Sequence, residues 1–312
     1  MTIRQRACRQ CSVRYSSPLR YPGGKAKFAE FVKAVFRANG LLDGEYAEPY
    51  AGGASVALTL LFEEYASRIH INDLDPGVFA FWYSVLHETE ALCRLVRDTS
   101  ASVVEWERQR RIYFNAAKES RLAHGFATFF LNRTNRSGII SSASMIGGRR
   151  QCGRWKLDAR YNQEELTGRI ARIARYSDRI TLSNLDALKF LARFTKNFPQ
   201  RALVYLDPPY YVKGRRRLYA NYYSDEDHEK ISSALSSLRV RWLVSYDDTP
   251  EIRHLYEHYR SIKCKVRYTA GNRYDGSELL VFCDRLVIPR REEVGGMIRT
   301  GHESGMLSGA LT

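Results

Sequence analysis

Hydrophobic residues recur along the chain at two spacings that alternate with each other. Ala26 to Ala38 places large apolar residues three or four positions apart, which predicts an amphipathic helix. Short apolar runs predict strands at Glu45 to Glu48 and Arg68 to Asp73, with a helix over Ser55 to Tyr65 between them. This order predicts a βαβ unit near the beginning of the chain.

The middle of the chain has a different character. Pro76 to Leu95 and Val103 to Phe130 are predicted to be helical, because both carry apolar residues at helical spacing. From Asn132 to Asp158 the periodicity gives way to Asn, Arg, Ser and Gly, which predicts a long loop. Loops of this length inside a folded domain are commonly functional.

Regular alternation resumes after this loop. Helices are predicted over Gln163 to Tyr176, Asp186 to Phe194, Asp225 to Leu238 and Pro250 to Tyr259. Strands are predicted at Ile180 to Leu185, Leu203 to Leu206, Arg241 to Ser245, Ile262 to Tyr268 and Glu278 to Cys283.

Seven predicted strands with helices between them indicate an α/β fold with a Rossmann-like, doubly wound sheet and a mainly helical insert. The expected division is an N-terminal extension over 1–17, a catalytic domain over 18–80 and 178–288, and an insert over 81–177. Residues 289–312 are rich in Gly, Ser and charge without any period, and are predicted to be a disordered tail.

Composition limits the class of protein. The chain has 312 residues of which 44% are hydrophobic, enough for a full core, so disorder as the main state is excluded. No apolar run approaches the roughly 20 residues that cross a bilayer, and the N-terminus lacks the apolar segment of a signal peptide. A cytoplasmic protein without membrane contact is therefore expected.

The six cysteines are scattered, which does not suit a disulfide framework. Cys8 and Cys11 have the spacing of one half of a zinc site, but no second pair completes four ligands. We expect free thiols there and no metal.

Lys and Arg number 49 against 34 Asp and Glu, a formal net charge of +15. A surplus of this size suits a polyanionic partner, and nucleic acid is the first candidate. Solvated arginines on an ordinary surface are the alternative reading.

The most specific motif is Asp207-Pro208-Pro209-Tyr210, directly after the predicted strand Leu203 to Leu206. Ligands of open α/β sheets bind at the carboxyl ends of strands. Because prolines have no N–H, a carbonyl there stays free to accept beside the Asp207 carboxylate. Two such acceptors suit the amino group of an aromatic base, and Tyr210 offers a flat face to its ring. A capped turn with a packed tyrosine is the alternative.

A second motif runs from Glu48 to Ser55, again from a strand end through a turn to a helix. Gly52 and Gly53 let the backbone approach a ligand closely, and the helix N-terminus favours an anion. Asp73 follows about 20 residues later at the next strand end, where an acid commonly accepts from ribose hydroxyls. A helix cap ahead of Pro76 is the alternative role for Asp73.

Together and in this order, the motifs resemble the Dam-type (class alpha) adenine-N6-specific DNA methyltransferases. The resemblance covers about Ser17 to Arg285. The matching segments are Leu19 to Lys25, Glu48 to Ser55, Asn72-Asp73, Phe130 to Arg133, Asn184 to Asp186, Asp207 to Tyr210 and Glu278 to Leu280.

The resemblance implies S-adenosylmethionine as cofactor and methyl transfer to the N6 amine of a flipped adenine in double-stranded DNA. Transfer would be direct, without a covalent enzyme intermediate. Asp207 and the Pro208 carbonyl would hold the amine and Tyr210 would stack on the base. The cofactor residues implied by the family pattern are Tyr21, Gly24, Lys25, Glu48, Pro49, Tyr50, Gly52, Gly53, Ser55, Asp73, Asp186 and Asp207.

The long loop coincides with the part of the family that recognises the target. The expected DNA contacts are Arg20, Arg133, Asn135, Arg136, Arg149, Arg150, Arg215 and Arg216. Known GATC readers of the family have an aromatic residue near Arg136 and an arginine near Ser141, and both are missing here. A target other than GATC is therefore expected, with Arg136 reading guanine or, alternatively, contacting a phosphate.

Three other functions fit the same residues. Methylation of RNA adenine or of cytosine N4 would use the same pair of acceptors, although the cytosine enzymes favour Ser at the position of Asp207. A catalytically silent DNA-binding protein would keep the fold alone. A monomer is expected, and a cognate restriction endonuclease is a further expected partner.

Overall fold

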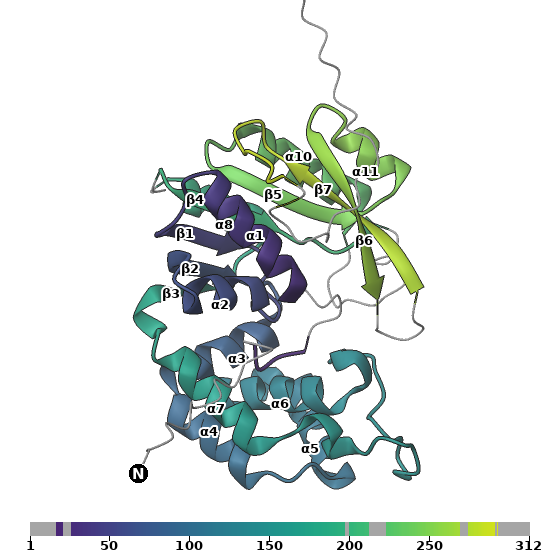
Figure 1. Cartoon of the computed structure of the whole chain (residues 1–312). Helices are drawn as coiled ribbons and strands as arrows, with labels where there is room; N and C mark the ends of the chain where they lie inside the picture. Colours follow the sequence, from purple (N-terminus) through teal and green to yellow (C-terminus); the bar gives the residue numbers. More distant parts are fainter. Residues whose placement is uncertain are drawn as a thin grey trace, which may run out of the picture.

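The computed structural model describes residues 17–20, 26–196, 200–211, 223–268, 274–290 and 292. Its centre is a seven-stranded sheet in the order β3-β2-β1-β4-β5-β7-β6 (Figure 1). The strands are β1 Gly44–Glu48, β2 Ala66–Asn72, β3 Ile180–Ser183, β4 Ala202–Leu206, β5 Arg241–Asp247, β6 Arg260–Tyr268 and β7 Tyr274–Phe282. The first five strands pair in parallel, and β7 runs antiparallel to both β5 and β6.

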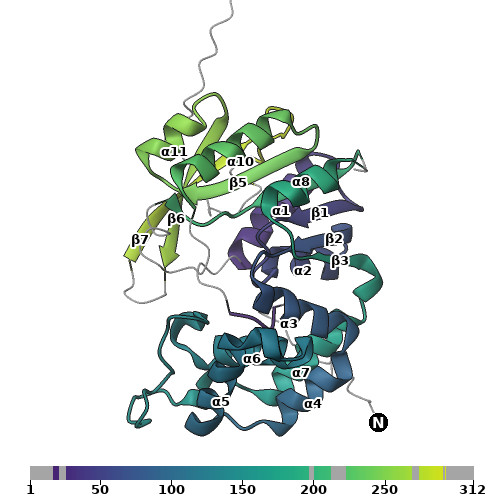
Figure 2. The same ribbon diagram turned by 180° about the vertical axis from the view of Figure 1, so that it is seen from behind.

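Helices cover both faces of this sheet. Figure 1 shows α1 (Ala26–Ala38) and α2 (Ser55–Phe62) on one face, and Figure 2 shows α8 (Ala187–Thr195) and α10 (Asp225–Ser237) on the other. The remaining α-helices are α3 Pro76–His87, α4 Thr89–Asp98, α5 Val103–Phe114, α6 Arg121–Thr134, α7 Gln163–Ala174 and α11 Pro250–Leu255. Single 3₁₀ turns are η1 Ala116–Lys118, η2 Arg136–Gly138, η3 Leu157–Arg160 and η4 Ser177–Arg179. The predicted doubly wound α/β fold is confirmed.

The strand order reverses between β1 and β4, which lie side by side at the centre of the sheet. All five residues of β4 are buried, as expected for a central parallel strand covered by helices on both faces. In open α/β sheets the crevice at such a reversal binds the ligand. The two motifs that follow β1 and β4 therefore meet at the binding edge.

The helical character predicted for two long stretches is confirmed, but each stretch contains a break that the periodicity did not indicate. Pro76 to Leu95 divides at Glu88, whose backbone leaves the helical region at φ −131° and ψ 33°, into α3 and α4. Val103 to Phe130 divides between Asn115 and Ser120, and Ser120 caps α6 by accepting from the Ala123 N–H. Hydrophobic spacing continues across both breaks, so it cannot locate them.

Helices α4 to α7 form a region beside the β3 end of the sheet, joined to it through α3 (Figure 1). Two glycines let α3 and α6 cross closely. A Cβ on Gly125 would lie 2.6 Å from the Ala80 carbonyl oxygen, and one on Gly77 would lie 2.5 Å from Thr128 Oγ1. The expected boundary between residues 80 and 81 falls inside α3, and the division into domains stays a prediction.

Several sequence expectations concern other parts of the chain. Among the described residues, no helix is both long and apolar enough to cross a membrane, and no group of His, Cys, Asp or Glu is placed to hold a metal. The Cys8 and Cys11 pair and nearly all of the predicted tail lie outside the described residues. The reversed direction of β7, which is antiparallel to its neighbours β5 and β6, was not part of the sequence prediction.

Candidate active site

The turn after β1 is tied to the strand end of β2 through Asp73. The Gly52 N–H donates to Asp73 Oδ2 at 2.8 Å, and the Asp75 N–H donates to Oδ1 at 2.9 Å. Gly52 has a φ of 45° and Ala54 a φ of 46°, so the turn uses left-handed backbone at two positions before α2 begins. Glycine adopts this conformation without strain, which explains the residue type at Gly52.

Asp73 is half-buried, and desolvation raises the pKa of its carboxyl to about 7, although its two backbone hydrogen bonds pull the pKa down. Each carboxylate oxygen keeps a lone pair beyond the bond it accepts. Two adjacent acceptors beside a glycine turn match the paired hydroxyls of a ribose. The alternative role as a cap of α3 belongs to Asp75 instead, which accepts from Gly77 and Val78.

We expect cofactor affinity to depend on pH through Asp73. The ionised carboxylate accepts from ribose hydroxyls, so the Kd should rise up to about tenfold per pH unit below pH 7 and level off above it. Because the folded pKa lies above its unfolded value, ionisation of Asp73 also lowers the stability of the ligand-free protein as pH rises through 7. Calorimetric titration with the cofactor across this range measures the first effect. Asp73→Asn should bind weakly with no such step, and an equal step in that variant would contradict the assignment.

Asn72 is a buried residue whose importance the sequence did not reveal. Its Nδ2 donates to the carbonyls of Pro49 and Leu185, both at 2.9 Å. Its Oδ1 accepts from the Leu185 N–H at 2.9 Å and from Ser183 Oγ at 2.7 Å. One amide therefore joins the segments that follow β1 and β3 to the end of β2, and so fixes three parts of the proposed cofactor site.

Other predicted cofactor residues lie around the same edge. Glu48 is buried, and its Oε1 accepts from the Ala57 N–H of α2 at 3.1 Å. Asp186 caps α8 by accepting from the Leu188 N–H at 2.9 Å. The Tyr50 and Tyr223 hydroxyls are 3.0 Å apart.

The remaining predicted cofactor residues divide into two groups. Pro49 and Gly53 lie in the turn between Glu48 and α2, and Ser55 is the first residue of α2. The expected contributions of Tyr21, Gly24 and Lys25 lie outside the described residues.

Asp207 follows the last residue of β4 and is partly exposed. Ser245 Oγ donates to its Oδ1 at 2.9 Å, and the Tyr205 hydroxyl lies 2.8 Å from Ser245 Oγ. Because a serine hydroxyl has one hydrogen, Tyr205 is the donor in that second bond. These two hydrogen bonds orient the carboxylate. Ser245 belongs to β5, so the motif after β4 does not by itself indicate this support.

Two buried acids hold the residues after the prolines. Tyr210 is 7% exposed and its hydroxyl donates to Glu278 Oε1 at 2.5 Å, while the Tyr211 N–H donates to Asp247 Oδ1 at 2.8 Å. Asp247 and Glu278 are directly opposite each other on β5 and β7. Like charges in this position repel unless each has a partner, and consecutive residues of the motif supply both partners. The motif is thereby fixed to two neighbouring strands.

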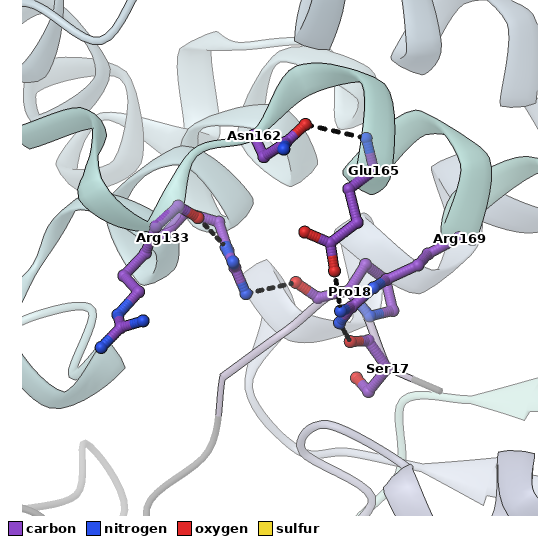
Figure 3. A network of polar contacts seen from close by, with 7 residues as sticks. Ser17, Pro18, Arg133, Asn162, Glu165 and Arg169 are labelled. Carbon is purple, nitrogen blue, oxygen red and sulfur yellow. Dashed lines mark hydrogen bonds and ion pairs between the residues drawn. The ribbon is translucent and has the colours of Figure 1, made fainter. Parts of the chain in front are cut away.

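Residues Asn132 and Arg133 of α6 hold the segment that leads into the cofactor site. The Asn132 side chain exchanges two hydrogen bonds of 2.7 Å with the Arg20 backbone and donates to the Gly138 carbonyl. Arg133 donates to the Pro18 carbonyl at 3.4 Å (Figure 3), beside an Arg169 side chain that pairs with Glu165.

Arg133 and Asn135 were expected to contact DNA, but both side chains are buried. Burial and the nearby Arg20 and Arg169 lower the pKa of Arg133 to about 9. Asn135 is 1% exposed, donates to the Ile139 and Ile140 carbonyls and accepts from Trp106 Nε1. Both side chains are bonded inside the fold, and we keep neither among the proposed DNA contacts.

The other predicted DNA contacts have different surroundings. Arg136, Arg149 and Arg150 are exposed, and Arg149 pairs with Glu107. Burial lowers the pKa of Arg20, and its Nη1 is buried without a hydrogen-bond partner in the described part of the chain. Arg215 and Arg216 lie outside the described residues.

The donors and acceptors at the edge suit the implied cofactor. Asp73 offers paired acceptors, Gly52 brings the backbone close to them, and Asp186 adds a carboxylate at the next strand end. An Asp-Pro-Pro-Tyr turn lies across the strand reversal from these residues. A seven-stranded sheet with these features defines a Rossmann-like methyltransferase.

The chain belongs to the D12 class N6 adenine-specific DNA methyltransferase family, whose model matches residues 21–270. The expected Dam-type family is therefore confirmed. No curated protein is significantly similar in sequence. Among solved structures the chain is similar to PH1948 from Pyrococcus horikoshii, provisionally assigned as an RNA methyltransferase. The two sequences are 8% identical, the match covers 83% of this chain and 82% of that one, and the TM-score is 0.39.

Proposed function

We propose that this member of the N6 adenine-specific DNA methyltransferases uses S-adenosylmethionine and modifies an adenine flipped out of a DNA duplex. The observation that carries the proposal is the pairing of β1 with β4, in which Ala47 lies opposite Val204. This register brings the Glu48 to Ser55 turn and the Asp207 turn to the same edge of the sheet. A cofactor bound by the first turn would lie beside a base bound by the second.

On the cofactor side, Asp73 would accept from the ribose hydroxyls and Asp186 from the adenine amine. Glu48 neutralises part of the positive end of α2 through its bond to Ala57 and keeps the turn in place. Tyr50, held by Tyr223, would contact the same cofactor. The bound cofactor supplies an electrophilic methyl group on a sulfonium.

On the base side, Asp207 would accept one hydrogen of the target amine and the Pro208 carbonyl the other. An aromatic amine is a weak nucleophile because its lone pair is conjugated with the ring. Holding both hydrogens favours a tetrahedral nitrogen whose lone pair can attack. The relay from Ser245 keeps the carboxylate in the orientation this needs, and the partly exposed Asp207 can pass the released proton to solvent.

Base recognition is proposed for the loop that begins at Arg136. The loop is closed by hydrogen bonds from the Arg136 N–H to the Ser144 carbonyl and from the Ile146 N–H to the Thr134 carbonyl. Ser137 and Gly138 have φ values of 56° and 77°, and a Cβ on Gly138 would lie 2.5 Å from the Arg20 carbonyl oxygen. The exposed Arg136 is thereby supported by a fixed backbone.

Sequencing the methylated adenines of a host that expresses the chain tests this function. We expect adenine methylation in one DNA context other than GATC. Arg136→Ala should change that context at one base pair, losing roughly 1 to 3 kcal/mol of discrimination if the side chain reads guanine. Arg150→Ala is the comparison, since a phosphate contact should lower all sites evenly. Dominant GATC methylation by the wild type would refute the expected specificity, and no DNA methylation beside activity on RNA would favour the RNA alternative.

We further propose that the protein acts in the cytoplasm as a monomer. A cognate restriction endonuclease stays a prediction. The test is to delete the methyltransferase gene and to ask whether the host can still maintain a neighbouring nuclease gene.

A further inference from the structure

Trp155 is the exposed tryptophan of the protein. It is 59% exposed, while Trp82 and Trp242 are fully buried and Trp106 is partly buried and bonded to Asn135. A large aromatic ring in water forgoes the stabilisation that burial would give it. Its position therefore calls for an explanation.

Two arginines lie over the Trp155 ring. The guanidinium carbon of Arg154 is 5.5 Å from the ring centroid and that of Arg160 is 5.9 Å away. At these distances a guanidinium interacts favourably with an indole face and limits its motion. An exposed indole and two guanidiniums in contact with it therefore form one positively charged aromatic site.

The loop that carries Trp155 is fixed by its own hydrogen bonds. Gln151 Nε2 donates to the Ile146 and Gly148 carbonyls, and its Oε1 accepts from the Leu157 N–H at 2.8 Å. Gly147 has a φ of 81°, and a Cβ there would lie 2.8 Å from the Trp155 carbonyl oxygen. The ring is exposed on an ordered backbone.

The charge around Trp155 is strongly positive. Residues 147–160 contain five basic side chains and a single acid, Asp158. Arg154 and Arg160 have no ion-pair partner among the described residues. Arg160 also lies close enough to Arg20 to lower its pKa, and the Arg20 Nη1 is buried without a partner in the described structure. An anion between these two arginines would satisfy both.

The segment between α6 and α7, which contains Trp155, lies on the side of the molecule where the parallel strands have their carboxyl ends. Asp247, at the end of β5, pairs with Glu278, so the beginning of β7 extends past the carboxyl ends of the parallel strands. Figures 1 and 2 both show the segment between α6 and α7 on the same side as that end of β6 and β7. Trp155 belongs to this segment.

We propose that Trp155, with Arg154 and Arg160, forms a contact surface for duplex DNA in which the indole stacks on a base face and the guanidiniums bind adjacent phosphates. The inference rests on the proposed function, since extrusion of an adenine is what exposes base faces inside a duplex. Trp155 would stack on a base within the duplex, a role separate from the contact of Tyr210 with the extruded adenine.

The test uses the full-length protein and a duplex containing the target site found by methylation sequencing. Acrylamide should quench the fluorescence of Trp155 in the free protein, and saturating duplex should protect Trp155 from this quenching. In the Trp155→Phe variant, the part of the tryptophan fluorescence that acrylamide quenches should be absent. Trp155→Ala should weaken duplex affinity roughly 5- to 150-fold with an unchanged salt slope, whereas Arg160→Ala should reduce that slope by about 1.

Phe114→Ala is the matched control, because Phe114 is also an exposed aromatic, at 54%, with the Arg110 guanidinium 4.8 Å from its ring centroid. It should leave affinity unchanged. Equal losses in the two alanine variants, or acrylamide quenching that duplex does not alter, would overturn the proposal. Methylation of the same duplex by the wild type tests the proposed function separately, so an active enzyme with no loss in Trp155→Ala refutes the stacking surface alone.

Discussion

Replacing Asp207 with alanine should abolish methyl transfer while cofactor binding stays near normal. The carboxylate follows β4 and is oriented by Ser245, whereas the cofactor residues follow β1, β2 and β3. Removing one preorganised acceptor typically lowers the rate of the chemical step by about 10²-fold or more. Single-turnover transfer of a labelled methyl group and calorimetric cofactor binding measure the two effects independently.

Asp207→Asn is the sharper comparison. Its size is unchanged, but one acceptor becomes an N–H donor that faces the hydrogens of the target amine. We expect a loss close to that of alanine, since charge and acceptor pattern both change. Near-normal turnover in either variant would refute the catalytic assignment. Loss of cofactor binding in both would mean instead that Asp207 acts in the cofactor site.

Asn72→Ala is expected to have the largest effect on stability. The substitution would leave two carbonyls, one N–H and one hydroxyl without the partner that Asn72 now gives them. A buried polar group without a partner costs about 1 to 3 kcal/mol; the bond to Pro49 is buried and the other three are part-buried, so a total near 3 kcal/mol is expected after partial rearrangement. The Tm should fall by roughly 6 °C or more. Cofactor affinity should fall with it, because the Pro49 carbonyl belongs to the first turn.

Asn39 supplies the control for this prediction. Its side chain makes three hydrogen bonds against the four of Asn72, to the Val35 and Val287 carbonyls and from the Val287 N–H, but at a half-exposed position where water can replace them. Asn39→Ala should therefore lower the free energy of unfolding by only about 1 kcal/mol. Equal thermal shifts in the two variants would contradict the role given to Asn72.

The sequence alone determined the fold class and the motif positions. Short apolar runs between segments of helical spacing predicted all seven strands, and the signal is strongest for β4 and β5, because a central strand buried on both faces needs a continuous apolar run. Asp207 and Asp73 could be singled out because their residue types stand directly at strand ends. The breaks in the predicted helices at Glu88 and after Asn115 were missed, since apolar spacing runs through them.

The tertiary structure decided which residues support those motifs. Asn72, Ser245, Asp247 and Glu278 act across strands that are far apart in the sequence, and pairing partners are set by the sheet rather than by local pattern. Tertiary packing also gives two of the arginines different surroundings. Arg133 and Arg136 are three residues apart and chemically identical in sequence, yet one is buried against the Pro18 carbonyl and the other is exposed, because α6 ends between them and only the first remains inside the packed helix.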